Sequence, residues 1–111
     1  MNKNKRFLSG TLSTIILAQL NQQGDMYGYE ICQKVSELTT GEIELTEAAI
    51  YPALHKMERE GLITSYKEKV QGRTRKYYKL NAEKSSIIDL QIADLLRFSQ
   101  NLKVLLNPYS V

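Results

Sequence analysis

The sequence predicts a mainly α-helical protein with one small β-hairpin and a long C-terminal helix. In four segments apolar residues recur every three or four positions, which is the period of an amphipathic helix. Two segments rich in Thr, Tyr, Val and Ile, Leu62–Val70 and Arg73–Leu80, flank Gln71-Gly72 and indicate a hairpin with glycine in its turn. The length of 111 residues suits a single modest core, and 24% charged residues is typical of a globular protein.

The other elements follow from periodicity and from residues that begin or end helices. We expect a short strand over Glu42–Leu45, where polar and apolar residues alternate. Thr46 is a good N-cap, Asn81 can cap the last helix, and Pro52 is expected to kink or loosen its helix because it lacks a backbone donor. The four expected helices are Leu8–Gln22, Gly28–Leu38, Thr46–Glu60 and Ala82–Leu106.

This order of three helices followed by a hairpin is that of a winged helix-turn-helix. In such domains the second helix of the motif enters the major groove of DNA, and the hairpin reaches an adjacent groove or the backbone. That helix is Thr46–Glu60 in this sequence. We therefore expect residues 1–80 to form a DNA-binding domain and residues 81–111 to form a C-terminal dimerisation helix and tail.

Basic residues are concentrated around these elements. The segment His55–Lys79 has eight basic residues and three acidic ones, and Lys3, Lys5 and Arg6 have no acidic neighbour. The net charge of the whole chain is only +3, so the remaining segments are acidic on balance. A basic patch on an otherwise acidic protein is typical of phosphate binding, although solvated surface charge is the alternative interpretation.

The candidate DNA-binding residues lie on three elements. With Ile50, Leu54 and Met57 facing inward, the opposite face of the third helix is available to bases and phosphates. The alternative interpretation of Tyr51 on that face is a packed aromatic side chain whose hydroxyl reaches the surface. The predicted set is Glu47, Ala48, Tyr51, Pro52, His55, Lys56 and Arg59 on the helix, Gly72, Arg73, Thr74, Arg75 and Lys76 on the hairpin, and Lys3, Lys5 and Arg6 at the N-terminus.

The last helix predicts a homodimer. At 1.5 Å per residue it is about 37 Å long, and its apolar stripe is too large for one small domain to cover. Exposing that stripe would leave a larger apolar patch than monomers usually tolerate. A two-fold dimer would read an inverted repeat in double-stranded DNA. The predicted interface residues are Leu8, Leu12, Ile88, Ile92, Leu95, Phe98, Leu102 and Leu106.

Other functional classes have little support in the sequence. Cys32 is the only cysteine, so no internal disulfide forms, which suits a cytoplasmic protein. No apolar stretch is long enough to cross a bilayer, and the basic N-terminus lacks a cleavage site for export. One histidine, His55, and one cysteine without ligand spacing or a Gly-rich phosphate loop give no reason to expect catalysis, a metal site or a cofactor.

Four motifs in order, Met26–Ile31, Ile50–Leu54, Glu58–Ile63 and Gly72–Leu80, resemble the PadR family of bacterial transcriptional regulators. The resemblance covers about residues 8–80, and the single C-terminal helix is similar to the short, LmrR-like branch. It implies a dimeric winged-helix repressor in which Tyr51 and the hairpin face DNA. It also implies that ligands of this repressor release it from DNA. A winged-helix module that binds proteins instead of DNA is the alternative function, and an enzyme is a distant third.

The resemblance also implies a small aromatic or hydrophobic effector at the dimer interface, between the first and last helices. The chain has no tryptophan, so the tryptophan sandwich associated with the drug-sensing members cannot form. Asn81-Ala82-Glu83-Lys84 replaces the Thr-x-x-Gly that usually leads into the last helix. Leu95 falls near the tryptophan position and Phe98 lies one turn on, so both are candidate effector contacts, with dimer packing as the favoured alternative.

Overall fold

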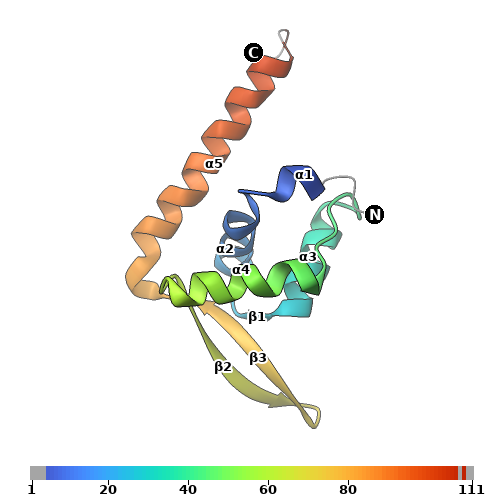
Figure 1. The fold of residues 1–111 in the computed structure, drawn as a ribbon, viewed down its shortest axis with the longest axis vertical. Coiled ribbons are helices and arrows are strands. Elements are labelled where there is room, and N and C mark those ends of the chain that lie inside the picture. The colour runs from blue at the N-terminus through green and yellow to red at the C-terminus, as the bar shows by residue number, and fades with distance from the viewer. Residues whose placement is uncertain (1–4, 108, 110–111) are drawn as a thin grey trace.

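The computed structural model describes residues 5–107 and residue 109, and Figure 1 shows the order of its elements. The helices are α1 (Lys5–Leu8), α2 (Leu12–Gln23), α3 (Gly28–Leu38), α4 (Glu47–Arg59) and α5 (Ser85–Leu106), with a 3-10 turn η1 (Ala82–Lys84) before the last. The strands are β1 (Met26–Tyr27), β2 (Ile63–Val70) and β3 (Arg73–Leu80). Helices α2, α3 and α4 pack together, while the β2–β3 hairpin and α5 extend away from them in different directions (Figure 1).

The expected first helix is divided into two. The backbone breaks at Ser9–Thr11, where Gly10 has φ of +84°, and α2 begins only at Leu12. The hydroxyl of Thr11 donates to the carbonyl of Phe7 at 3.0 Å and so closes the end of α1. The apolar spacing of this segment gives no sign of the break, because Leu8 and Leu12 still pack against the core from the two pieces.

The sheet differs from the expected one in its third strand. Residues 42–45 form no strand, so the prediction for Glu42–Leu45 is wrong. This loop is fixed by Thr39, whose hydroxyl accepts the backbone N–H of Ile43 at 3.0 Å, and the alternation reflects a loop that buries Leu45. The third strand is the two-residue β1, which pairs antiparallel with β3 so that Met26 lies opposite Tyr78 and the strand order is β1-β3-β2.

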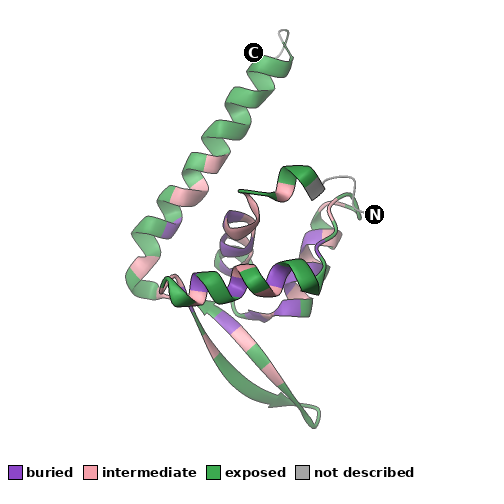
Figure 2. Ribbon diagram, viewed as in Figure 1, coloured by how far each residue is buried: buried purple, intermediate pink, exposed green. Residues whose placement is uncertain are grey.

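The core gathers between the inner faces of α2, α3 and α4, with the base of the sheet on one side (Figure 2). Ile50, Leu54 and Met57 are completely buried, which confirms the predicted inner face of α4. Cys32 also belongs to the core, and burial raises the pKa of its thiol. The core therefore fixes how α4 is rotated about its axis, and with it which residues face solvent.

The start of α4 agrees with the sequence, and the kink or loosening expected at its proline stays a prediction. The side chain of Thr46 accepts the backbone N–H of Ala49 at 3.1 Å, which is the expected N-cap. Pro52 lies inside the helix, which continues to Arg59.

The last helix is attached to the domain only through its first turns. Asn81 caps the 3-10 turn by accepting the backbone N–H of Glu83, and α5 itself begins at Ser85, three residues later than expected. Ile88 is buried in the core, and Gln91 donates to the hydroxyl of Thr14 on α2 at 2.8 Å. Beyond these contacts α5 projects away from the domain with most of its residues exposed (Figure 2).

Within the part of the chain that the structure describes, no helix is long and apolar enough to cross a membrane.

Candidate nucleic-acid interface

The solvent-facing side of α4 follows directly from its buried side. With Ile50, Leu54 and Met57 inward, the exposed residues Ala48, Pro52, His55, Arg59 lie on the other side of the helix, at the spacing of 3.6 residues per turn. Glu47 is exposed in the first turn, where its carboxylate also complements the positive end of the helix dipole. An α-helix that faces solvent in this way has the dimensions that fit a major groove.

Tyr51 lies at one edge of that exposed face and is half-buried. Its ring covers Gly28 at the start of α3 so closely that a Cβ atom there would lie 2.8 Å from the tyrosine oxygen. Burial, followed by the nearby carboxylate of Glu47, raises the pKa of the hydroxyl, which can donate a hydrogen bond. The structure therefore gives this side chain a packing contact on one side and leaves part of it accessible.

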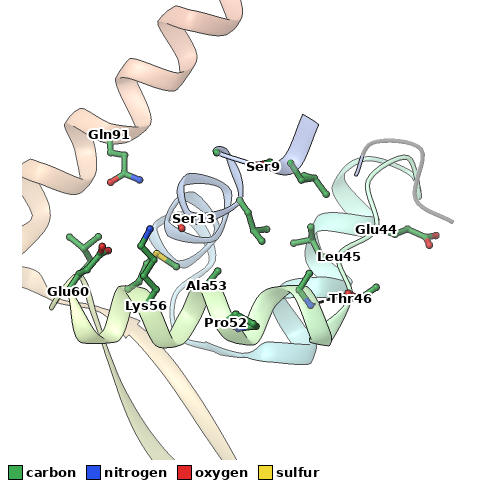
Figure 3. Close-up of a pocket in the computed structure, with 16 residues that line it drawn as sticks. Ser9, Ser13, Glu44, Leu45, Thr46, Pro52, Ala53, Lys56, Glu60 and Gln91 are labelled. Carbon is green, nitrogen blue, oxygen red and sulfur yellow. Dashed lines mark hydrogen bonds between the residues drawn. The ribbon is translucent and has the colours of Figure 1, made fainter. Parts of the chain in front are cut away.

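Pro52 and Lys56 extend to the other edge of the exposed face and line a groove. The groove has a volume of about 890 Å³ and lies between α4, the α1–α2 segment and the loop before Thr46. Figure 3 shows Lys56 and Glu60 pointing from α4 into this space, with Gln91 of α5 on its far side. Lys56 is thus shared between the predicted DNA-facing set and the wall of the groove.

The β2–β3 hairpin, called the wing below, presents two faces with different residues. Its register places Tyr66 opposite Tyr77, Glu68 opposite Arg75, and Val70 opposite Arg73. Because side chains alternate along a strand, these pairs share one face, called the tyrosine face. The other, called the lysine face, carries Ser65 opposite Tyr78, Lys67 opposite Lys76, and Lys69 opposite Thr74.

The tyrosine face fastens the wing to the start of α3. The guanidinium of Arg75 lies 4.4 Å from the ring centre of Tyr27, which contacts Tyr77 edge-on at 5.5 Å. Tyr77 in turn stacks on Tyr66 at 5.6 Å, and the Tyr66 hydroxyl donates to Asp25 at 2.8 Å. That hydrogen bond is the main reason why the pKa of Tyr66 rises to about 12. Arg75, predicted as a DNA contact, is therefore half-buried in an intramolecular cluster.

The lysine face meets α4 through one carboxylate. Glu58 accepts a hydrogen bond from the Ser65 hydroxyl at 2.5 Å and lies 3.7 Å from the ammonium of Lys76. Both contacts are partly exposed, so their contribution to stability is small. They nevertheless show that the lysine face is the face of the wing that is turned towards α4.

Of the N-terminal basic residues, Arg6 does not join this surface. Figure 1 shows α1 on the opposite side of α4 from the wing. Arg6 is exposed there, with its guanidinium 5.0 Å from the ring centre of Phe7. Lys3 lies outside the described residues, and of Lys5 only the backbone is described.

Several residues of this surface were not found from the sequence. Asp25, Tyr27, Gly28 and Glu58 position the wing and Tyr51, yet none stands out by charge or periodicity. The available signal was that Tyr27 and Gly28 lie within the first PadR-like motif and that Glu58 begins the third. Residues 5–107 and 109 contain no cluster of His, Cys, Asp and Glu that could hold a metal ion.

A family model described as the transcriptional regulator PadR-like family matches residues 16–83, which include α3, α4 and the whole wing. This chain belongs to the PadR-like family of transcriptional regulators. A relative from Lysinibacillus sphaericus, described as uncharacterized protein X, is 36% identical over 76 residues, or 68% of this chain and 69% of the relative.

Solved structures extend the family match to the whole fold. A transcriptional regulator from Clostridium thermocellum has a TM-score of 0.75 at 26% identity and covers 96% of this chain and 99% of its own. A PadR family regulator from Clostridium difficile has a TM-score of 0.68 at 33% identity, covering 85% and 95%. Bacillus subtilis PadR, solved in complex with operator DNA, has a TM-score of 0.61 at 27% identity, covering 77% of this chain and 46% of that PadR.

The winged-helix fold class and the PadR family are thus confirmed, and both belong to transcriptional regulators. Within this PadR-like chain the structure brings together the exposed face of α4 and the wing. The assignment to the LmrR-like branch stays a prediction.

Proposed function

We propose that this PadR-like chain is a cytoplasmic repressor that binds an inverted-repeat operator in double-stranded DNA as a homodimer. Residues 1–80 form the DNA-binding domain, and residues 81–111 form the dimerisation helix and tail. The observation that carries the proposal is the exposed face of α4 flanked by a wing rich in lysine and arginine. Bacillus subtilis PadR, which has a similar fold, is known in complex with operator DNA.

In this proposal α4 reads bases and the wing holds the backbone. Glu47, Ala48 and Tyr51 lie in the N-terminal half of the helix, which reaches deepest into a major groove in helix-turn-helix docking. His55 and Arg59 lie further back, where phosphates are the closer partners. Gly72–Lys76 form the tip of the wing and its approach to an adjacent groove.

The homodimer is supported by the apolar residues that α5 leaves uncovered. Phe98 is 57% exposed and Leu106 is 79% exposed, and both lie on the part of α5 that projects from the domain. Ile88 is 1% exposed in a single copy, so it belongs to the protomer's own core and not to the interface. The proposed interface is therefore Leu8, Leu12, Ile92, Leu95, Phe98, Leu102 and Leu106.

The groove beside α4 supports the same assembly. Its lining includes Leu8, Leu12 and Leu45, so it offers an apolar surface next to the first turns of α5. The distal half of α5 from a second copy carries the apolar residues needed to fill it.

Leu95 and Phe98 lie outside the lining of this groove. A small aromatic or hydrophobic effector is therefore proposed against these two residues, in the space completed by the second copy.

The test of DNA binding starts from a random pool of duplexes. Repeated selection with the full chain should enrich an inverted repeat whose half-sites lie about one helical turn, or a multiple of it, apart. Binding should weaken steeply as salt rises, because phosphate contacts release counterions. Failure to enrich any duplex, or binding that ignores salt, would argue for a protein-docking module instead.

The test of assembly is sedimentation of the full chain and of Leu102→Asp. The wild type should sediment as a dimer, and the buried charge should shift the variant towards monomer. The matched variant Asp94→Asn, on an exposed position of the same helix, should remain dimeric. A Leu102→Asp variant that remains dimeric at micromolar concentration would place the interface elsewhere.

The effector proposal is tested by titrating a planar aromatic dye into wild type and Phe98→Ala, and equal affinities would contradict it.

A further inference from the structure

We propose that the wing contacts the DNA backbone with its lysine face, through Lys67, Lys69 and Lys76, and that Arg75 positions the wing from the other face. This inference rests on the proposed function and adds to it the residues that hold the phosphates. Lys67 and Lys69 lie on β2, inside the basic stretch His55–Lys79 but outside the candidate DNA-binding residues that the sequence predicts.

The first observation is a like-charge pair within the hairpin. Lys67 lies directly opposite Lys76 in the β2–β3 register. Side chains at directly opposed positions have Cβ atoms about 4.5–5.5 Å apart, and like charges placed there destabilise the sheet. An anion that binds between or beside the two ammonium groups removes that repulsion, so the arrangement favours a ligand with negative charge.

The second observation is the contrast between the two faces. On the tyrosine face Arg75 has the acidic residue Glu68 at the directly opposed position, and its guanidinium lies 4.4 Å from the ring centre of Tyr27. On the lysine face, the ammonium of Lys76 lies 3.7 Å from the carboxylate of Glu58 and 5.4 Å from the ring centre of Tyr78. Neither Lys67 nor Lys69 forms an ion pair or a side-chain hydrogen bond within the described part of the chain. The lysine face therefore carries three lysines and no acidic residue of the hairpin, whereas Glu68 lies on the tyrosine face.

The third observation is where that face lies. Glu58 of α4 touches Ser65 and Lys76, both on the lysine face, so this face is turned to the same side as α4. Beyond Glu58 the next lysines towards the tip are Lys67 and Lys69. A duplex held against the exposed side of α4 would carry its backbone along these ammonium groups. A row of uncompensated lysines spaced along a strand suits the regular phosphates of a nucleic acid backbone.

The experiment compares Lys67→Gln with Lys79→Gln. Both variants lose one positive charge from the same hairpin, but Lys79 lies on the tyrosine side of β3, since it alternates with Tyr78. The probe is a fluorescent duplex of arbitrary sequence, about 30 base pairs or three helical turns long, titrated at several salt concentrations. Each phosphate contact contributes about 0.9 to the slope of log affinity against log salt.

A dimer carries two wings, so Lys67→Gln should reduce that slope by about 1.8. When the salt concentration rises from about 50 to 200 mM, the fold-loss of affinity should be roughly ten times smaller for the variant than for the wild type. Lys79→Gln should keep the wild-type slope. An unchanged slope in Lys67→Gln, or an equal reduction in Lys79→Gln, would overturn the assignment of the lysine face.

A second variant separates binding from folding. Lys67→Glu places opposite charges across the strands, so its melting temperature should equal or exceed that of the wild type while its affinity for the same duplex falls at least tenfold. Retained affinity would overturn the inference. A wild-type chain whose duplex binding does not depend on salt would instead refute the proposed function, and the inference with it.

Discussion

Replacing Gly28 by alanine tests the contact that fixes Tyr51 beside α4. The added Cβ would lie 2.8 Å from the tyrosine oxygen, 2.9 Å from Cζ and 3.0 Å from Cε1. Ordinary van der Waals separations between such atoms are about 3.5–4.0 Å, so the ring has to move by roughly 0.5–1 Å. The backbone of Gly28 is not in the left-handed region, so alanine is tolerated there apart from this contact.

The expected change in the free energy of unfolding of Gly28→Ala follows from two opposing effects. Overpacking of a well-filled site costs about 1–3 kcal/mol. Alanine restricts the unfolded chain, which returns about 0.4–1 kcal/mol where the backbone conformation is compatible. We expect a net loss of about 1–2 kcal/mol in the free energy of unfolding, and a drop in melting temperature of roughly 4–8 °C for a chain of this size.

A double-mutant cycle in urea isolates the cause. In a Tyr51→Ala background the space above Gly28 is empty, so Gly28→Ala should be neutral or slightly stabilising. The coupling between the two substitutions should therefore be about 1–3 kcal/mol, which is the overpacking cost itself. Equal destabilisation by Gly28→Ala in both backgrounds would refute the steric account. Duplex binding by Gly28→Ala should also weaken, because the displaced ring lies at the edge of the proposed DNA-facing surface.

Three further predictions concern the wing and the start of α4. The hydrogen bond to Asp25 raises the pKa of Tyr66 from 10 to about 12, so it stabilises the fold fully below pH 10 and is lost as the pH rises through 12. The melting temperature of the wild type should accordingly fall more between pH 10 and 12 than that of Tyr66→Phe, and parallel curves would contradict this. Thr46→Ala should lower the free energy of unfolding by about 1 kcal/mol in urea, while Thr46→Ser should nearly preserve it. Arg75→Ala should weaken duplex binding several-fold by loosening the wing from Tyr27, with its salt slope and its sedimentation unchanged; a shallower slope would make Arg75 a direct phosphate contact.

Local patterns were sufficient for α4. Its N-cap, its inner face and its end are each set by residues a few positions apart, and the structure confirms Thr46 as the cap and Ile50, Leu54 and Met57 as buried. The same local reasoning failed at Glu42–Leu45, because alternation reports which side chains turn inward and not whether a partner strand is present. The strand that does pair, Met26–Tyr27, is too short to show any period.

The candidate site, too, was only partly predictable from the sequence. Sequence composition located the positive charge in the wing, but the face on which each base lies depends on the register of β2 with β3. That register places Arg75 over Tyr27 and leaves Lys67 opposite Lys76. Similarly, the sequence offered Tyr51 as a DNA contact or as a packed residue, and the close approach of its ring to Gly28 shows that packing is part of its role.

The sequence by itself determined the winged-helix order of elements, the family, and the segments that carry positive charge. These are properties of neighbouring residues, since helix periods, caps and charge runs are all encoded within a few positions of the chain. Only the tertiary structure decided that Ile88 closes the core of its own protomer, that Lys67, Lys69 and Lys76 share one face of the wing, and that Asp25 and Glu58 contact the wing. Those outcomes depend on contacts between residues far apart in sequence, which form only when the helices and the sheet pack together.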